Sequence, residues 1–159
     1  MRFLKWAIIF ILFNSAFLES KEGYADNNGV EIFYVDYGPI DNEPILLVQG
    51  LGGQLTFWPD ELISVLQDSG FRPIVYDNRD VGLSKNFEEY GRPNFVWNYA
   101  KFYLGLPLSS VYSLADMASD GIAVINHLNI EQTHLLAQSM GGMITQRMVC
   151  LLYTSPSPR

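Results

Sequence analysis

Ser139 stands in a sequence pattern that could present a nucleophile to a substrate. Residues 135–137 form an apolar run before it, and the serine is followed by Gly141, Gly142 and a helix-forming segment. If the run is a buried strand, the serine lies on a sharp strand-to-helix turn, which is the geometry that exposes a nucleophilic serine. The pattern alone has little specificity, because a small-x-Ser-x-Gly string occurs by chance in about one chain in ten. An ordinary turn between a strand and a helix is the competing interpretation.

The same hypothesis explains why small residues surround the serine. Side chains two positions before and two positions after it face each other across the turn, so Ala137 and Gly141 must be small. Gly142 then lets the new helix lie close to the sheet.

A second glycine-rich segment follows another apolar run. Residues 44–49 have the composition of a strand that is buried on both faces. Gly50, Leu51, Gly52 and Gly53 follow directly. Glycines at such a place let the backbone turn and bring its amide N–H groups toward a ligand.

The order of the remaining predicted elements favours a layered α/β sheet. Apolar, β-branched and aromatic runs predict strands, and apolar residues at helical spacing between capping and stop signals predict helices. The predicted strands are residues 29–37, 44–49, 71–77 and 133–137, and the predicted helices are residues 58–69 and 114–128, with a further helix after the serine. Ser113 is the expected N-cap of the second helix and Asn129 its stop.

Residues 85–111 are irregular and rich in aromatic side chains. They could form an excursion or a short lid, with aromatic rings that line a site for an apolar substrate. The alternative, which we favour, is a long connection whose aromatic side chains simply pack it.

Composition limits the class of protein. A chain of 159 residues that is 48% hydrophobic can bury one modest core, so one domain is expected. The formal net charge of −7 argues against nucleic acid and anionic membranes as partners. With Cys150 as its one cysteine and His127 and His134 as its two histidines, the chain is expected to have no internal disulfide and no metal site. Both histidines are interpreted as structural.

The N-terminus predicts export. A short basic start is followed by an apolar run of about 13 residues, which is typical of a signal peptide and short of the about 20 residues that span a bilayer. We therefore assign residues 1–20 to a signal peptide of a secreted or periplasmic protein. An uncleaved membrane anchor is the alternative.

The C-terminus contrasts with the domain before it. Residues 148–159 resemble a translated sequencing-adaptor sequence more than the polar face of a continuing helix. We expect these residues to lie outside the native domain, which leaves residues 24–147 as the domain.

Several motifs occur together and in order. They are Gln49-Gly50-Leu51-Gly52-Gly53, Trp58-Pro59, Tyr76-Asp77-Asn78-Arg79-Asp80-Val81-Gly82-Leu83-Ser84, Asp116-Met117-Ala118 and Ser139-Met140-Gly141-Gly142-Met143-Ile144. The ordered set resembles the N-terminal half of an α/β-hydrolase, and it is similar to bacterial carboxylesterases of the aclacinomycin-methylesterase-like type. The resemblance covers residues 24–147 and is far more specific than the serine pattern alone.

The resemblance implies a role for each part of the site. Ser139 would be the nucleophile, and the backbone N–H groups of Met140 and Leu51 would form the oxyanion hole. Gly50, Ala137, Gly141 and Gly142 would support the two turns. Gln49 stands where such enzymes often have a histidine that shapes the loop. Asp77, Arg79 and Asp80 would fix a loop and would not supply the acid of the triad.

The resemblance also implies an ester hydrolase that needs no cofactor or metal and acts on a small apolar ester. In this family the acid and the histidine follow the serine in chain order, and no credible candidate follows Ser139 here. We therefore expect the chain by itself to be inactive. A perhydrolase, a C–C bond hydrolase or an acyltransferase would use the same serine, and a non-catalytic binding protein would have lost the triad. Dehalogenases and epoxide hydrolases of this fold use an aspartate nucleophile, so Ser139 argues against both.

Overall fold

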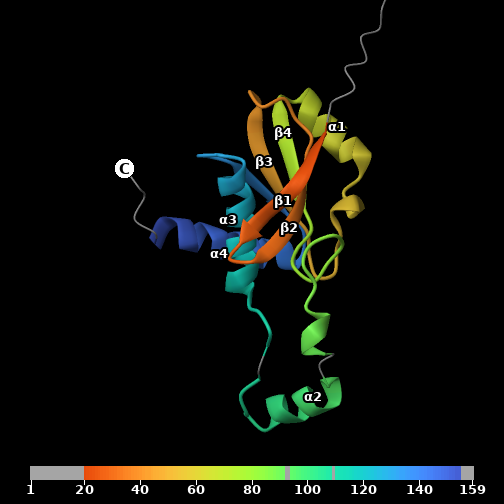
Figure 1. Cartoon of the computed structure of the whole chain (residues 1–159), viewed down its shortest axis with the longest axis vertical. Helices are drawn as coiled ribbons and strands as arrows, with labels where there is room; N and C mark the ends of the chain where they lie inside the picture. The colour runs from red at the N-terminus through yellow and green to blue at the C-terminus, as the bar shows by residue number, and fades with distance from the viewer. Residues whose placement is uncertain (1–19, 92–93, 109, 155–159) are drawn as a thin grey trace, which may run out of the picture.

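A mixed five-stranded sheet lies at the centre of the computed structural model, which describes residues 20–91, 94–108 and 110–154 (Figure 1). The strands are β1 (Lys21–Asn27), β2 (Val30–Asp36), β3 (Glu43–Val48), β4 (Phe71–Tyr76) and β5 (His134–Ala137). Their order is β1-β2-β4-β3-β5. The strands β4, β3 and β5 run parallel to one another, whereas β1 and β2 are antiparallel to their neighbours.

Helices lie on both faces of this sheet. The described helices are α1 (Asp60–Asp68), α2 (Phe95–Tyr103), α3 (Leu114–His127) and α4 (Met140–Thr154), with 3-10 turns η1 (Leu55–Phe57) and η2 (Glu88–Tyr90). The helix α1 packs on one face of the sheet, and α3 and α4 pack together on the other. The α/β fold class predicted from the sequence is confirmed.

Two-sided burial explains the apolar runs of the central strands. Successive side chains of a strand point to opposite faces, so β3 sends Ile45 and Leu47 toward α1 and sends Leu46 and Val48 toward α3 and α4. These four side chains are all buried. Burial of one such side chain contributes about 1.5–3 kcal/mol, which is why both faces must be apolar.

The strand β1 was not predicted from the sequence. It pairs with β2 across a two-residue turn in which Asn28 and Gly29 have φ angles of 54° and 87°. Asparagine followed by glycine favours this tight hairpin. The turn was predicted, but β1 has only Ala25 buried and therefore lacks the apolar pattern of a strand.

The helix α3 begins at Leu114, directly after its expected N-cap, Ser113. The Ser113 side chain accepts a hydrogen bond from the Asp116 backbone N–H, and the Asp116 carboxylate accepts one in return from the Ser113 N–H. This reciprocal pair holds two backbone donors that the first turn of a helix leaves unsatisfied. Asn129, with φ of 54°, follows the end of the helix.

The helix α4 continues into the segment that the sequence analysis placed outside the domain. Met148 is completely buried in the core shared with α3, and α4 ends at Thr154. Met148 therefore belongs to the folded core. The predicted signal peptide and residues 155–159 of the predicted tail lie outside the described residues.

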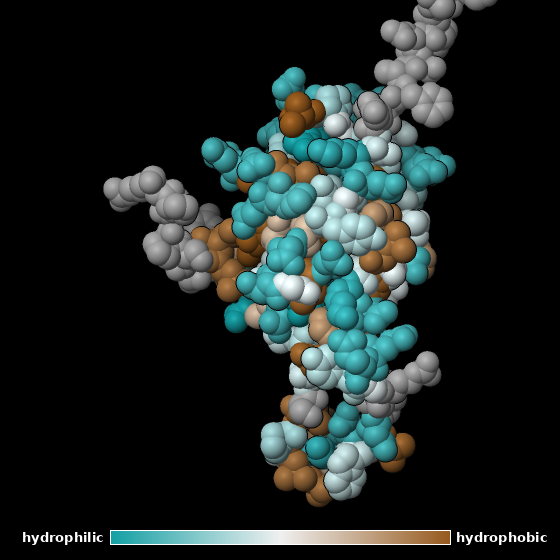
Figure 2. Space-filling view, viewed as in Figure 1, coloured by the Kyte–Doolittle hydropathy of each residue, from teal (hydrophilic) through white to brown (hydrophobic). Residues whose placement is uncertain are grey.

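The segment between β4 and α3 forms an excursion from the sheet and its covering helices (Figure 1). It contains α2, which stands away from the sheet and its helices as an arm (Figure 1). The helix residues Trp97, Tyr99, Phe102 and Tyr103 are exposed, so these side chains neither pack the connection into the body nor line a closed site among the described residues. Figure 2 shows hydrophobic side chains on the surface of this arm.

Candidate active site

Three loops meet at one edge of the sheet because β3, β4 and β5 are parallel. The glycine-rich loop follows β3, the Asp77–Asp80 segment follows β4, and the serine turn follows β5. The carboxyl ends of parallel strands lie at the same edge, which is where open α/β sheets bind ligands. The structure therefore brings together the segments that the sequence singled out.

Ser139 lies on a sharp turn between β5 and α4. Its φ angle is 54°, in the left-handed region that residues other than glycine seldom adopt. The N–H of Gln138 donates to the Val48 carbonyl at 3.1 Å, and the N–H of Gly141 donates back to the Gln138 carbonyl at 2.9 Å. The serine side chain is exposed, and within the described residues its hydroxyl has no hydrogen-bond partner. The turn thus presents a free hydroxyl on a fixed backbone.

The close approach of α4 to the sheet, which was predicted for Gly142, occurs at Gly141. A methyl group on Gly141 would overlap the carbonyl oxygen of Val48, so α4 starts directly against the end of β3. Gly142 has open space around it and permits no close approach. Gly141 is therefore small because of the neighbouring strand. Ala137 is half-buried at the end of β5, where it pairs with Val48.

The glycine-rich loop turns back on itself beside the serine. The N–H of Gly53 donates to the Gly50 carbonyl at 3.2 Å, and Gly52 between them has a φ of 68°. A Cβ atom on Gly50 would lie 3.0 Å from the Ser139 Cβ, so the start of the loop rests on the serine. This contact places Leu51 next to the candidate nucleophile.

Two backbone donors at this place are free. Within the described part of the chain, neither the Leu51 N–H nor the Met140 N–H donates a hydrogen bond. An open depression of about 440 Å³ lies beside them and is lined by residues 49–53, Phe57, Gln138 and Ser139. Free N–H groups beside an exposed hydroxyl are the parts that an acyl-transfer site needs.

The segment after β4 has the loop-fixing contacts that the sequence predicted. The buried Asp77 carboxylate accepts the backbone N–H of Leu55 at 2.7 Å and that of Leu83 at 2.9 Å. The Ser84 hydroxyl donates to the Asp77 carbonyl and accepts the N–H of Phe33. Asp80 accepts the hydroxyl proton of Tyr112 at 3.2 Å. Burial, with a contribution from Asp80, raises the pKa of Tyr112.

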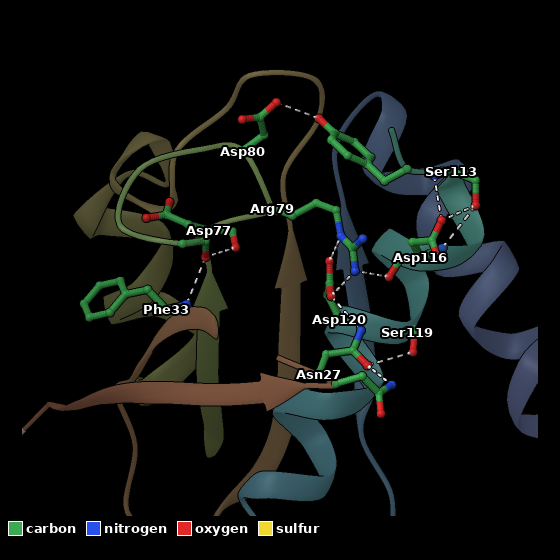
Figure 3. Close-up of polar contacts among 12 residues, drawn as sticks. Asn27, Phe33, Asp77, Arg79, Asp80, Ser113, Asp116, Ser119 and Asp120 are labelled. Atoms are coloured by element: carbon green, nitrogen blue, oxygen red, sulfur yellow. Dashed lines mark hydrogen bonds and ion pairs between the residues drawn. The ribbon is translucent and has the colours of Figure 1, made fainter. Parts of the chain in front are cut away.

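Arg79 crosses from the end of β4 to α3 (Figure 3). Its guanidinium donates to both carboxylate oxygens of Asp120, at 2.6 and 2.7 Å, and lies over the rings of Phe87 and Tyr112. These hydrogen bonds raise the pKa of Arg79, so it stays charged. Asp120 also accepts the side-chain N–H of Asn27 at 2.7 Å. The Arg79–Asp120 ion pair, with Asn27, therefore connects β1, the end of β4 and α3.

Neither histidine is near Ser139. His134 begins β5, at the opposite end of that strand, and bonds to the exposed Glu43 at 2.9 Å. His127 ends α3 and packs against the ring of Tyr34. Within the described chain, both histidines make their contacts away from the serine turn.

Two further observations describe the site's surroundings. No group of three or more potential metal-ligating side chains occurs among residues 20–91, 94–108 and 110–154. In the same ranges, no helix has the length and apolar content needed to cross a bilayer.

Comparison with known protein families agrees with the geometry. A family model described as the alpha/beta hydrolase fold matches residues 43–158. The chain belongs to the α/β-hydrolase family. The expectation drawn from the ordered motifs is thereby confirmed.

Curated relatives of this α/β-hydrolase chain include named hydrolases. RutD of Variovorax paradoxus (strain S110), which bears the name "Putative carbamate hydrolase", is 30% identical over 113 residues, covering 71% of this chain and 35% of that protein. Rhodomycin D methylesterase DauP of Streptomyces sp. (strain C5) is 27% identical over 103 residues, covering 65% of this chain and 28% of that protein. The chain thus spans about a third of the length of these relatives.

Solved structures show the same fold at lower identity. The thioesterase domain from the curacin biosynthetic pathway is 20% identical with a TM-score of 0.62, covering 83% of this chain and 40% of that one. Epoxide hydrolase VrEH1 from Vigna radiata is 21% identical with a TM-score of 0.61, covering 84% and 36%. At these identities the likeness concerns the fold alone.

Sequence reasoning did not single out Asn78 or Asp120. Asn78 is buried and donates to the Gln49 carbonyl at 3.0 Å, so it contacts the start of the glycine-rich loop. Asp120 is completely buried on the apolar face of α3. A carboxylate among Met117, Gly121 and Val124 is a signal that could have been used, because a buried charge requires a partner.

Proposed function

We propose that this α/β-hydrolase chain supplies the nucleophile and the oxyanion hole of a serine hydrolase that cleaves carboxylic esters through an acyl-enzyme. The observation that carries the proposal is the Ser139 turn, which exposes a free hydroxyl beside two free backbone donors. The curated relatives named as a methylesterase and a carbamate hydrolase support acyl-transfer chemistry in general.

The proposed reaction follows from this arrangement. The Ser139 Oγ attacks the ester carbonyl carbon while a base takes the hydroxyl proton, and the carbonyl oxygen becomes an oxyanion that accepts the N–H groups of Leu51 and Met140. The C–O bond to the alcohol then breaks, and the alcohol leaves with the proton from the base. Water attacks the acyl-enzyme in the same way and releases the acid. Removing one such donor typically costs about 2.7–4 kcal/mol of transition-state stabilisation.

The base and the acid are not among the described residues near Ser139. Because the chain spans about a third of the relatives' length, we propose that residues beyond this sequence provide both groups. A serine without a base is a weak nucleophile. The 159-residue chain alone is therefore proposed to be inactive toward esters.

The substrate is proposed to be a small ester with an apolar acyl or alcohol part. Leu51 and Phe57 line the depression beside the serine, and their side chains are exposed. Apolar surface at the mouth of the depression would gain from contact with an apolar group on the substrate.

A fluorophosphonate probe tests the proposal, because it reacts with activated serines only. The full-length protein should be labelled, labelling should be lost in Ser139→Ala, and it should persist in Ser64→Ala. Ser64 is a matched control because its exposed hydroxyl donates only to the Asp60 carbonyl within α1. An unlabelled but folded full-length protein would contradict the enzyme and favour a binding protein that has kept the fold.

We propose separately that the protein is exported from the cytoplasm. The basic and apolar start of residues 1–20 would direct the protein out of the cytoplasm, and an uncleaved segment would attach it to the membrane. Fractionation of cells that express the protein with and without residues 1–20 tests this, because only the first should reach the periplasm, the medium or the membrane.

A further inference from the structure

The glycine-rich loop has little internal support, although it would carry one of the two oxyanion donors. Its backbone makes one hydrogen bond within the loop, from the Gly53 N–H to the Gly50 carbonyl. At its tip the Leu51 side chain is 84% exposed, and a Cβ atom on Gly52 would meet nothing within 4 Å. Preorganised donors contribute to catalysis only if they hold their direction before the substrate arrives. The structure must therefore fix this loop from outside.

Two consecutive residues contact the loop at its two ends. Asn78, which is 1% exposed, donates from its side-chain amide to the Gln49 carbonyl at 3.0 Å, where the chain leaves β3. Asp77, which is 3% exposed, accepts the Leu55 backbone N–H at 2.7 Å, where the loop enters η1. No side chain of the described chain bonds to the backbone of residues 50–54 between these points.

We propose that Asp77 and Asn78 are positioning residues that clamp both ends of the glycine-rich loop and thereby set the direction of the Leu51 N–H. The inference rests on the proposed function, because the direction of the Leu51 N–H affects catalysis only if Ser139 is the nucleophile. The clamp leaves the Leu51 N–H itself without a hydrogen bond among the described residues, so this donor is available while the ends of the loop are fixed.

The clamp is itself rigidly mounted. Both residues follow β4, which lies between β2 and β3 in the sheet, and the Asp77 backbone N–H bonds to the Phe33 carbonyl at 3.0 Å. The second carboxylate oxygen of Asp77 accepts the Leu83 N–H at 2.9 Å. A Cβ atom on Gly82, whose φ is 57°, would overlap this carboxylate, so the loop after β4 closes tightly over it.

The side chain of Gln49 does not hold the loop through its amide N–H groups. Its buried Nε2 atom has no hydrogen-bond partner among the described residues. The contact that Asn78 makes is with the Gln49 backbone carbonyl, which belongs to the peptide unit leading into Gly50. The orientation of that peptide therefore depends on Asn78.

Amide hydrogen exchange and kinetics on the full-length protein test the proposal. In Asn78→Ala and in Asp77→Ala, the hydrogen-bonded amides of Gly53 and Leu55 should exchange about fivefold faster or more, the factor expected for loss of one hydrogen bond. The kcat for an ester should fall about tenfold to a hundredfold with little change in KM, because the loss concerns the transition state.

Asn27→Ala is the matched control. It removes a side-chain amide that donates at 2.7 Å to Asp120, at a place that does not touch the loop. In Asn27→Ala, the amide exchange rates of the glycine-rich loop and the kcat should match those of the wild type. If Asn78→Ala does not fold, Asn78→Leu keeps about the size of the side chain, removes the donor and buries no charge.

Two outcomes would overturn the clamp. One is loop exchange and kcat unchanged in folded variants at both positions. The other is an Asn27→Ala variant that accelerates loop exchange as much as they do, which would mean a general loss of stability. Failure of the proposed function looks different, because the wild type would then not react with the fluorophosphonate whatever the exchange data show.

Discussion

Two regions of the molecule place polar and apolar side chains in opposite ways. One is the edge of the sheet where the Ser139 turn and its neighbouring loops meet, and the other is the arm that contains α2. At the edge, Asp77, Asn78, Arg79 and Asp120 are all buried, and each makes a side-chain hydrogen bond. In the arm, Trp97, Tyr99, Phe102 and Tyr103 are all more than half exposed. The two regions are joined directly, through Arg79 and the rings of Phe87 and Tyr112.

The difference shows where the stability of this fold comes from. Apolar residues of the arm contribute little to the described core, although a hydropathy count would assign them to it. Buried polar residues contribute a great deal, because a buried polar group that loses its partner costs free energy. Four predictions test this contrast, from the largest expected effect to the smallest.

Breaking the Arg79–Asp120 pair should have the largest effect. Asp120→Ala leaves the Arg79 guanidinium and the Asn27 amide without their partner and should lower the free energy of unfolding by about 3–5 kcal/mol. Urea unfolding measures it. The exposed pair between Lys85 and Glu89 is the control, and Glu89→Ala should cost less than about 1 kcal/mol. Equal losses in the two variants would contradict the contrast.

Two adjacent glycines should respond in opposite directions. Gly141→Ala forces a methyl group onto the Val48 carbonyl and should destabilise the protein by about 1–3 kcal/mol. Gly142→Ala places the same group in open space within α4 and should stabilise it by up to about 1 kcal/mol. Thermal unfolding of both variants checks this. A destabilised Gly142→Ala protein would mean that α4 lies closer to the sheet than described.

Removal of the α3 cap should have a pH-dependent effect. Ser113→Ala should cost about 1 kcal/mol at neutral pH. Hydrogen bonds from the Ser113 hydroxyl and backbone N–H lower the pKa of Asp116, so the charged carboxylate stabilises the folded state above its ordinary pKa. That contribution is lost as the pH falls through the lowered value. The difference between wild type and variant should therefore shrink below about pH 4. A difference that is constant from pH 7 to pH 2.5 would rule out this cause.

Truncation of the arm's side chains should have the smallest effect. Trp97→Ala and Phe102→Ala should each change the free energy of unfolding by less than about 0.5 kcal/mol, because both side chains are exposed. Denaturant unfolding of the full-length protein decides it. A loss of 2 kcal/mol or more would show that the arm is packed against another part of the protein and would remove the contrast between the two regions.

The two regions also differ in how far the sequence predicted them. Residues 44–49 were predicted as a strand buried on both faces because two-sided burial imposes a continuous apolar run, and residues 71–77 were predicted as the next strand. Both were found, as β3 and β4. The turn at Ser139 was predicted because its small residues and position after a strand occur together. In these cases one physical constraint acts on neighbouring residues, so it is visible in a short stretch of sequence.

Contacts between distant residues were not visible in this way. Asn78 contacts Gln49 and Arg79 contacts Asp120 across 29 and 41 residues, and no local pattern reports such pairs. The helix α2 was missed although Phe95, Tyr99 and Phe102 have helical spacing, because the aromatic residues between and beside them obscure the pattern and the whole stretch was interpreted as irregular. The close approach to the sheet that was predicted for Gly142 is made by Gly141. Which of the two glycines lies against the end of β3 depends on the path of the chain through the turn.

Trapping of an acyl-enzyme tests the central claim most directly. The full-length protein, mixed with a slowly hydrolysed activated ester and quenched in acid, should gain the mass of one acyl group. Peptide mapping should place that group on Ser139, and Ser139→Ala should gain none. An acyl group found on another residue, or ester turnover that persists in Ser139→Ala, would contradict the account.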